Sequence, residues 1–392
     1  MRANVLTDAR LVKLAGQFAW LDIDTEKPGN FAFVERFPIE AWPTILVIDP
    51  ATEQVALRWM GTATAGELER LLLAAARTLR KEKTDAAGAA MARGAALAAA
   101  REHARAAEAY GAALEAGGLA WPGRPEAADA LLQALSLGKD PAPCAEAARK
   151  FLPSLPHGSA AARVAAAGLV CAVSLEAPAA RAEAIAVLEP AAGGALVFPG
   201  VPSDDRSGLY DALLGARKAS KDEGGARAVA GDWLGWIEAE SARATTPLAR
   251  SAFDGARLTA AMTLGDLQRV IPALEASAQA LPGEYFALAY LARGYLEAGR
   301  PKQAAATARA AAALAQGPRR VNILVVEARA LRAAGDVLGA KTAVDEAIRH
   351  GEGLPEAVRP RGVLKAARTL RDELDREAKG QPVGPAKAAP GK

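Results

Sequence analysis

The sequence predicts an α+β, multidomain protein: a small amino-terminal α/β domain followed by an all-α solenoid of helix pairs. Hydrophobic residues make up 51% of the 392 positions and aromatic residues only 5%, and the excess is visibly alanine, the strongest helix former. Short, β-branched apolar runs typical of strands stand out in the first 80 residues. Farther along, a helical pattern recurs about every 34 residues, a period typical of stacked helix pairs.

The first 80 residues change their hydrophobic period several times. Residues 5–15 and 28–37 place apolar side chains at helical spacing, whereas FAWLDID (18–24) is a short apolar run typical of a strand. TILVID (44–49) is apolar and β-branched, which favours a central parallel strand buried on both faces. VALRWMG (55–61) fits an antiparallel edge strand.

A closing helix is expected over residues 64–81. Thr64 is a good N-cap, and Glu67 three residues later completes a capping box, in which each side chain bonds the other residue's backbone N–H. Trp42 and Trp59 fit core and loop packing better than a ligand platform.

The run LDIDTEKPGNFAFVERFPIEAWPTILVID resembles the segment between the third and fourth strands of the thioredoxin family, and RWMGTATAGELERLL resembles that family's last strand and helix. The resemblance covers about a fifth of the chain and defines a partial thioredoxin-like domain over residues 1–80. It implies a cis Trp42–Pro43 bond. It also implies that Trp42, Pro43 and Thr44 form a loop that positions a substrate backbone.

The family's CxxC pair is absent, although a helix amino terminus is where such a pair is activated. MRANVLTDARLV looks like the residues that follow CxxC, so a redox pair would lie upstream of Met1. Two explanations stay open: the record starts too late, or strands 18–24 and 44–49 pair directly. With no CxxC the chain as written is not an oxidoreductase. A missing leader would make it periplasmic or exported rather than cytoplasmic.

Cysteine and histidine positions predict no catalytic or metal site. Cys144 and Cys171 have neither CxxC nor zinc-site spacing, and we expect buried structural thiols, with a disulfide as the open alternative. His103, His157 and His350 lack an obvious carboxylate or cysteine partner in sequence. Asp22, Asp24 and Asp49 are expected to cap turns. We therefore expect no cofactor and no metal.

Charge and hydropathy exclude two classes of partner. The formal charge is +3 from 48 basic and 45 acidic residues, a balance that argues against nucleic-acid binding. No stretch reaches the roughly 18 apolar residues that a membrane span needs.

Repeated glycines define the helix pairs. Gly265, Gly299 and Gly335 each close a first helix, and five residues after each comes a residue expected where paired helices cross, in turn Val270, Ala304 and Ala340. The run YFALAYLARGYLEAGRPKQAAATARAAAAL resembles a tetratricopeptide repeat (TPR). Repeats are expected at 87–120, 251–284, 285–318 and 321–354.

The other segments are less regular. Residues 84–245 contain the clear repeat 87–120 and then helical patterns without a clean repeat, interrupted by an expected long loop at 194–208. Residues 251–376 form an array ending in a capping helix at 355–376. The tail 377–392 is expected to be disordered.

The TPR resemblance implies a peptide-binding concave face on the first helices. Projection of its binding positions gives Phe286, Arg293, Asn322, Arg329 and Arg332. An Asn/Arg face suits an acidic segment or a terminal carboxylate. The leading hypothesis is a non-catalytic interaction or scaffold protein with protein or peptide partners and a redox-inactive thioredoxin-like module. The alternative is a thioredoxin-type oxidoreductase or chaperone whose CxxC precedes an incorrectly assigned start.

Overall fold

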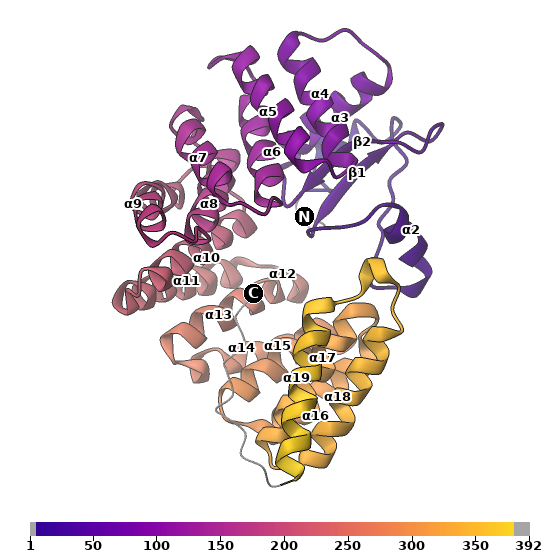
Figure 1. Ribbon diagram of the computed structural model, residues 1–392, viewed down its shortest axis with the longest axis vertical. Helices are drawn as coiled ribbons and strands as arrows, with labels where there is room; N and C mark the ends of the chain where they lie inside the picture. Colours follow the sequence, from indigo (N-terminus) through magenta and orange to yellow (C-terminus); the bar gives the residue numbers. More distant parts are fainter. Residues whose placement is uncertain (1–4, 380–392) are drawn as a thin grey trace. The chain divides into compact units, whose positions relative to one another are not determined.

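The computed structural model describes residues 5–379, and the chain divides into two compact units (Figure 1). Unit 1 comprises residues 1–20 and 39–233, and unit 2 comprises 21–38 and 234–392. The boundary falls within helix α11 (Glu223–Arg243). These units differ in two ways from the expected division at residues 80, 84 and 251. Segment 21–38 belongs with the carboxyl-terminal helices, and residues 39–233 form one unit.

The strand content of unit 1 is a single antiparallel hairpin. Strands β1 (Thr44–Ile48) and β2 (Val55–Met60) pair from Thr44 with Met60, and a bulge after Val47 shifts the register to Ile48 with Val55. The predictions of a central parallel strand at 44–49 and of a strand at 18–24 are therefore wrong. Residues 18–24 form no strand because no neighbouring strand satisfies their backbone groups.

The hairpin packs on helices through β2. Trp59 is 1% exposed, and its indole N–H donates to the Thr62 carbonyl at 3.0 Å. β2 contacts α3 (Ala65–Leu79) and α4 (Ala86–Ala99). The predicted capping box is confirmed, since Glu67 N–H donates to Thr64 Oγ1 and Thr64 N–H to the Glu67 carboxylate. The predicted helix over residues 5–15 shortens to α1 (Ala9–Val12).

Helix pairs fill the rest of unit 1. The predicted repeat 87–120 is the pair α4 and α5 (His103–Gly117), in which Gly94 lies against the Tyr110 ring. The segment without a clean repeat also forms helices, namely α6 (Arg124–Ser136), α7 (Ala142–Phe151), α8 (Ser159–Val173), α9 (Pro178–Ala195), α10 (Ser203–Ala219) and α11. The expected loop 194–208 is wrong in length: only residues 196–202 separate α9 from α10.

Several helices of unit 1 end at a non-glycine residue in the left-handed conformation. Arg101 after α4 has φ 62° and Lys221 after α10 has φ 57°. Each lies in a Schellman-type turn, in which the next N–H reaches five residues back, as from Asp222 to the Arg217 carbonyl at 2.9 Å. A left-handed backbone costs an L-residue about 1–2 kcal/mol, so these ends are less stable than glycine would make them.

A disulfide joins Cys144 of α7 to Cys171 of α8. The expectation of two free buried thiols is therefore wrong, although both residues are buried. The helices also approach closely at Gly168, where an added Cβ would lie 2.2 Å from the Ala148 Cβ. This close crossing brings the two helices together, and the disulfide links them covalently.

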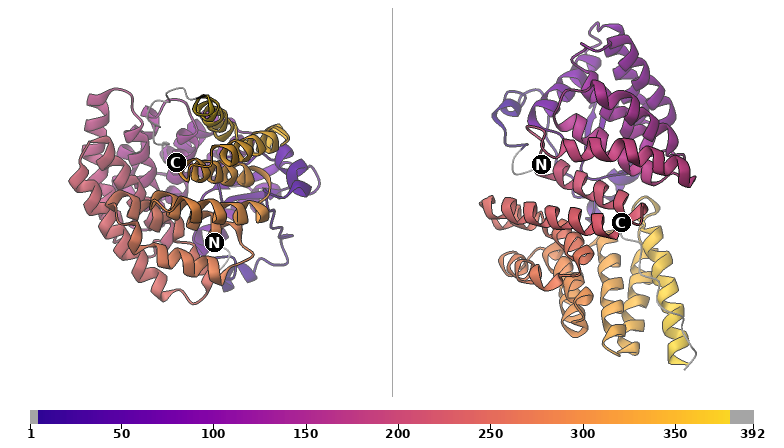
Figure 2. Two further views of the ribbon diagram at one scale, coloured as in Figure 1. Left: turned by 90° about the horizontal axis from the view of Figure 1, so that it is seen from below. Right: turned by 90° about the vertical axis from the view of Figure 1, so that its left-hand side faces the viewer.

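Unit 2 is a succession of antiparallel helix pairs, visible side by side from orange to yellow in Figure 2. Its array consists of α12 (Pro247–Ser251), α13 (Asp254–Leu264), α14 (Ile271–Ala280), α15 (Tyr285–Glu297), α16 (Pro301–Leu314), α17 (Gly317–Ala333), α18 (Val337–Glu352) and α19 (Arg361–Ala378). The first helices α15, α17 and α19 contact one another in turn. Residues 380–392 of the expected disordered tail lie outside the described residues.

The glycine prediction for unit 2 is confirmed. Gly265, Gly299 and Gly335 have φ values of 73°, 72° and 84°, and each lies in a Schellman turn closed by a five-residue backbone bond of 2.8–3.0 Å. The predicted crossing positions are also buried: Ala304 and Ala340 are fully buried, and Val270 is 1% exposed. Left-handed glycine thus ends each first helix and lets the second one return along it.

Candidate functional site

The predicted binding residues lie on the adjacent first helices α15 and α17. Phe286 and Arg293 of α15 are separated by 36 residues from Asn322 and Arg329 of α17, and these helices contact each other. All four side chains are half-buried. We call the surface formed by these four residues the first-helix face.

Two arginines of the first-helix face have no partner among the residues that the structure describes. Within residues 5–379, neither Arg293 nor Arg329 makes an ion pair or a side-chain hydrogen bond. Other arginines of the unit do: Arg309 donates to Glu327 at 2.8 Å, and Arg320 donates to Glu346 at 2.8 Å. The unpaired arginines leave two sets of guanidinium donors for an external acceptor.

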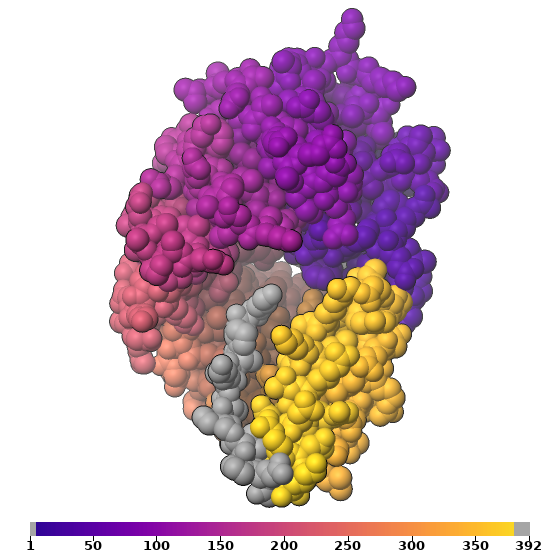
Figure 3. Space-filling view, viewed as in Figure 1, coloured from indigo at the N-terminus to yellow at the C-terminus, as the bar shows by residue number. Residues whose placement is uncertain are grey.

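Arg332 plays a different part from the one predicted. Its guanidinium donates to Glu373 at 2.6 Å and to Glu377 at 2.9 Å, both on α19, which is yellow in Figure 3. Hydrogen bonding to Glu377 and Glu373 raises the pKa of Arg332. Arg332 thus ties α17 to the capping helix, and we leave it out of the first-helix face.

A carboxylate contact at the amino-terminal ends of α15 and α17 is absent from the sequence predictions. Glu26 Oε1 accepts from Tyr285 Oη at 3.0 Å and from Arg319 Nε at 2.9 Å. Burial and this carboxylate raise the pKa of Tyr285 above its ordinary value. The acidic alternation of Asp22, Asp24 and Glu26 is visible in the sequence, but Tyr285, a partner of Glu26, lies 259 residues away.

The Trp42–Pro43 bond is cis, and the loop that contains it is held by the hairpin. The Pro43 carbonyl accepts from Gly61 N–H at 2.7 Å, and Thr44 Oγ1 donates to the Ala41 carbonyl at 2.6 Å. Trp42 is 60% exposed, whereas Trp59 is core, as predicted. The role of Trp42, Pro43 and Thr44 as a substrate loop stays a prediction.

The densest charge cluster in unit 1 surrounds Arg163 of α8. Its guanidinium donates to Glu67 at 2.7 Å, Asp129 at 2.6 Å and Asp205 at 2.9 Å, and lies over the Trp59 ring at 5.8 Å. Burial raises the pKa of Asp129 to about 6 and also raises the pKa of Asp205, although Arg163 opposes both shifts.

The remaining groups of this cluster are held ionised. Burial opposes ionisation of Glu67, but Arg163 and the Thr64 N–H lower its pKa. Burial also lowers the pKa of Arg163, and the three carboxylates outweigh that effect and raise it. The cluster joins α3, α6, α8 and α10, and every donor faces a protein acceptor, so its geometry is structural.

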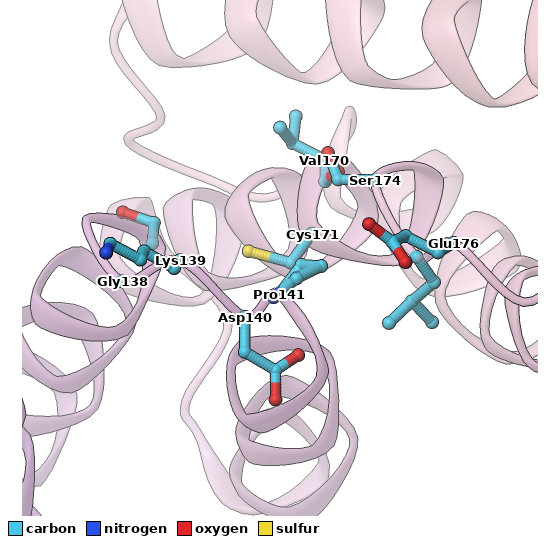
Figure 4. A pocket seen from close by; sticks show the side chains of 10 residues that line it. Gly138, Lys139, Asp140, Pro141, Val170, Cys171, Ser174 and Glu176 are labelled. Carbon is cyan, nitrogen blue, oxygen red and sulfur yellow. The ribbon is translucent and has the colours of Figure 1, made fainter.

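A surface pocket of about 560 Å³ lies beside the disulfide (Figure 4). It is lined by the α6–α7 turn with Lys139 and Asp140 and by the end of α8 with Cys171 and Ser174. Asp140 caps the Ala142 N–H at 2.9 Å, and Cys171 is consumed by its disulfide. The Cys171 sulfur is therefore not a free thiolate.

Histidines and carboxylates elsewhere have structural partners. His103 Nε2 lies 3.1 Å from Glu40, so the expectation that it lacks a carboxylate partner is wrong. Asp24 and Asp49 cap local backbone N–H groups, as predicted. Over the described part of the chain, no group of three or more His, Cys, Asp or Glu side chains could hold a metal. No helix there is long and apolar enough to span a membrane.

Comparisons with known proteins add little to this geometry. No protein-family model matches the chain, and no curated protein matches it. Similar solved structures include a tetratricopeptide repeat protein from Parabacteroides merdae, at 11% identity and a TM-score of 0.44, covering 72% of this chain and 99% of that one. Another is the TPR2AB domain of yeast Sti1 in complex with pHSP90, at 13% identity and a TM-score of 0.27, covering 74% and 98%. At these scores, the assignment of helix pairs rests on the chain's own contacts.

Proposed function

We propose that this chain is a non-catalytic interaction protein whose first-helix face binds an acidic segment, or a terminal carboxylate, of a partner protein. One observation carries the proposal: Arg293 and Arg329 are half-buried and unpaired within residues 5–379. Each side chain is partly covered by the protein, yet its guanidinium has no acceptor among the described residues. A partner carboxylate would supply the missing hydrogen bonds.

The geometry of the face fits a peptide better than a small ion. Arg293 and Arg329 occupy equivalent positions on neighbouring helices, so two acidic side chains of one extended segment can reach both. A charge-assisted hydrogen bond contributes about 1.5–3 kcal/mol, and Arg pairs carboxylates in a bidentate fork. Asn322 adds donors for peptide carbonyls, and Phe286 adds an apolar contact.

The test uses the full chain and an array of synthetic peptides that vary in Asp and Glu content and end in a free carboxylate or an amide. We expect acidic peptides to bind, and Arg329→Ala to weaken their binding about tenfold or more. Arg349→Ala is the matched control, because it removes the same positive charge from an exposed position on the second helix α18. Equal binding by both variants would refute the first-helix face.

For residues 39–80, which lie in unit 1, the proposal is a thioredoxin-like platform without redox chemistry. The chain's only two cysteines lie in α7 and α8, far along the sequence from the Pro43 loop, and they are buried in a disulfide. The hairpin, by contrast, is integrated into unit 1 through Trp59 and α3. An insulin-reduction assay on the chain checks this, and turnover above the uncatalysed rate would contradict it.

The disulfide also bears on localisation. Disulfides form and persist in oxidising compartments and are rare in the cytosol. The pair Cys144–Cys171 therefore supports the exported alternative over the cytoplasmic one. Thiol alkylation of the protein taken directly from its cells and denatured tests this: the proposal predicts no labelling before reduction, and complete labelling would overturn it.

A further inference from the structure

Residues Leu21–Pro38, which we call the docked segment, pack on the helices of unit 2. The segment contains the 3₁₀ turn η1 (Pro28–Asn30) and helix α2 (Phe31–Arg36). Val34 is 3% exposed, and Phe31 packs against the core cluster of the unit. α2 also contacts the turn η4 (Glu356–Val358) before α19. An apolar anchor thus holds one end of the docked segment.

The other end of the docked segment presents one carboxylate. Asp24 Oδ1 accepts from the Glu26 N–H at 3.0 Å, and the Asp24 carbonyl accepts from Asn30 Nδ2 at 2.8 Å. These bonds fix a compact turn from which the Glu26 side chain projects. Glu26 Oε1 then accepts from both Tyr285 Oη and Arg319 Nε.

The receiving surface is shaped for this backbone. Gly317, the first residue of α17, has φ 51° and is buried, and an added Cβ would lie 2.7 Å from the Glu26 carbonyl oxygen. Only glycine lets the docked segment approach so closely. Tyr285 also packs edge-to-face on Phe286 of the first-helix face, with ring centroids 6.1 Å apart, so the contact adjoins that face.

We propose that Tyr285 and Arg319 form a carboxylate-binding site for acidic peptides, which the docked segment occupies in cis. A partner peptide must displace Glu26 to bind there. The ligand class follows from the segment itself, LDIDTEK, with acidic residues at every second position. The inference deepens the proposed function by naming a ligand and its competitor, and it rests on residues outside the first-helix face.

Intramolecular occupation determines the expected affinities. A tethered ligand faces its site at an effective concentration on the order of millimolar, so it competes strongly with a free peptide. The probe is a fluorescein-labelled synthetic peptide with the sequence of residues 21–38, titrated into the full chain and followed by anisotropy. We expect the Glu26→Gln chain to bind it about tenfold or more tightly than the wild type does.

Variants of the receiving side chains test the site itself. In the Glu26→Gln chain, adding Tyr285→Phe or Arg319→Ala should each weaken peptide binding about tenfold, whereas adding Arg349→Ala should not. A probe peptide that carries the Glu26→Gln change itself should bind the Glu26→Gln chain no more tightly than the original peptide binds the double variants. Unchanged affinity in the Arg319→Ala double variant would overturn the proposal.

Release of the docked segment is measured separately by hydrogen exchange of its amides. Glu26→Gln should raise their exchange, and Gly317→Ala should do so by steric exclusion. Unchanged exchange in both variants refutes occupation in cis. If Arg329→Ala abolishes peptide binding and Arg319→Ala does not, this inference fails while the proposed function stands; the reverse result removes the first-helix face and keeps the carboxylate site.

Discussion

Replacing Arg163 with methionine should destabilise unit 1 strongly and in a pH-dependent way. Methionine keeps the approximate length of the side chain but removes the cation that, within residues 5–379, pairs with Asp129, Asp205 and Glu67. Removing one partner of a buried ion pair costs about 3–5 kcal/mol, because the remaining charge is left uncompensated. We expect that loss at pH 8, where the carboxylates are ionised.

The loss should be smaller at pH 5, since the orphaned carboxylates can then take up protons. The stability of the wild type should also depend on pH through Asp129. The folded pKa of Asp129 is about 6, above an unfolded value near 3.9. Between these values the folded state binds more protons, so the free energy of unfolding falls as pH rises. For Asp129 alone the fall from pH 5 to pH 8 is about 1 kcal/mol.

Urea unfolding followed by tryptophan fluorescence is a suitable assay, because most of the six tryptophans belong to unit 1 and only Trp236 to unit 2. The matched control is Arg149→Met on α7, whose ion pair with Glu183 is largely exposed and should contribute under about 1 kcal/mol. A loss below 1 kcal/mol for Arg163→Met, or an equal loss at both pH values, would refute the account of this cluster.

Four further variants test the helix pairs. Lys221→Gly should raise the free energy of unfolding by about 1 kcal/mol in urea titrations, because it relieves a left-handed lysine; a loss contradicts this. Gly168→Ala should lower the melting temperature, since overpacking costs about 1–3 kcal/mol. Gly208→Ala, with open space around it, should raise the melting temperature. Removing the disulfide by Cys144→Ala with Cys171→Ala should cost about 3 kcal/mol; a urea midpoint equal to that of the disulfide-bonded wild type, both measured without reductant, would contradict this.

Local signals in the sequence predicted the helix pairs where glycine marks their ends. Gly265, Gly299 and Gly335 reveal the array of unit 2 because a left-handed turn strongly favours glycine. The sequence predicts the pair at 87–120 of unit 1 from residues other than its turn, which Arg101 holds. A search for turn glycines misses a later helix end of unit 1, because Lys221 holds the equivalent turn at some cost in strain. A residue pattern cannot show that cost, which tertiary packing offsets.

Features that depend on distant partners were beyond sequence reasoning. An apolar run such as FAWLDID forms a strand only where another strand satisfies its backbone, and the described residues provide none. The pairing of Arg332 with Glu373 and Glu377 depends on how α19 packs on α17. The docked segment shows the same limit, because Glu26 and Tyr285 are 259 residues apart.

The central claim is that two unpaired arginines on α15 and α17 bind an acidic partner. Titration calorimetry of the best acidic array peptide against the wild type and the Arg293→Ala, Arg329→Ala double variant tests it most directly. The account predicts that the double variant loses about a hundredfold in affinity, and that added salt weakens wild-type binding. Affinities within twofold of each other would contradict the claim.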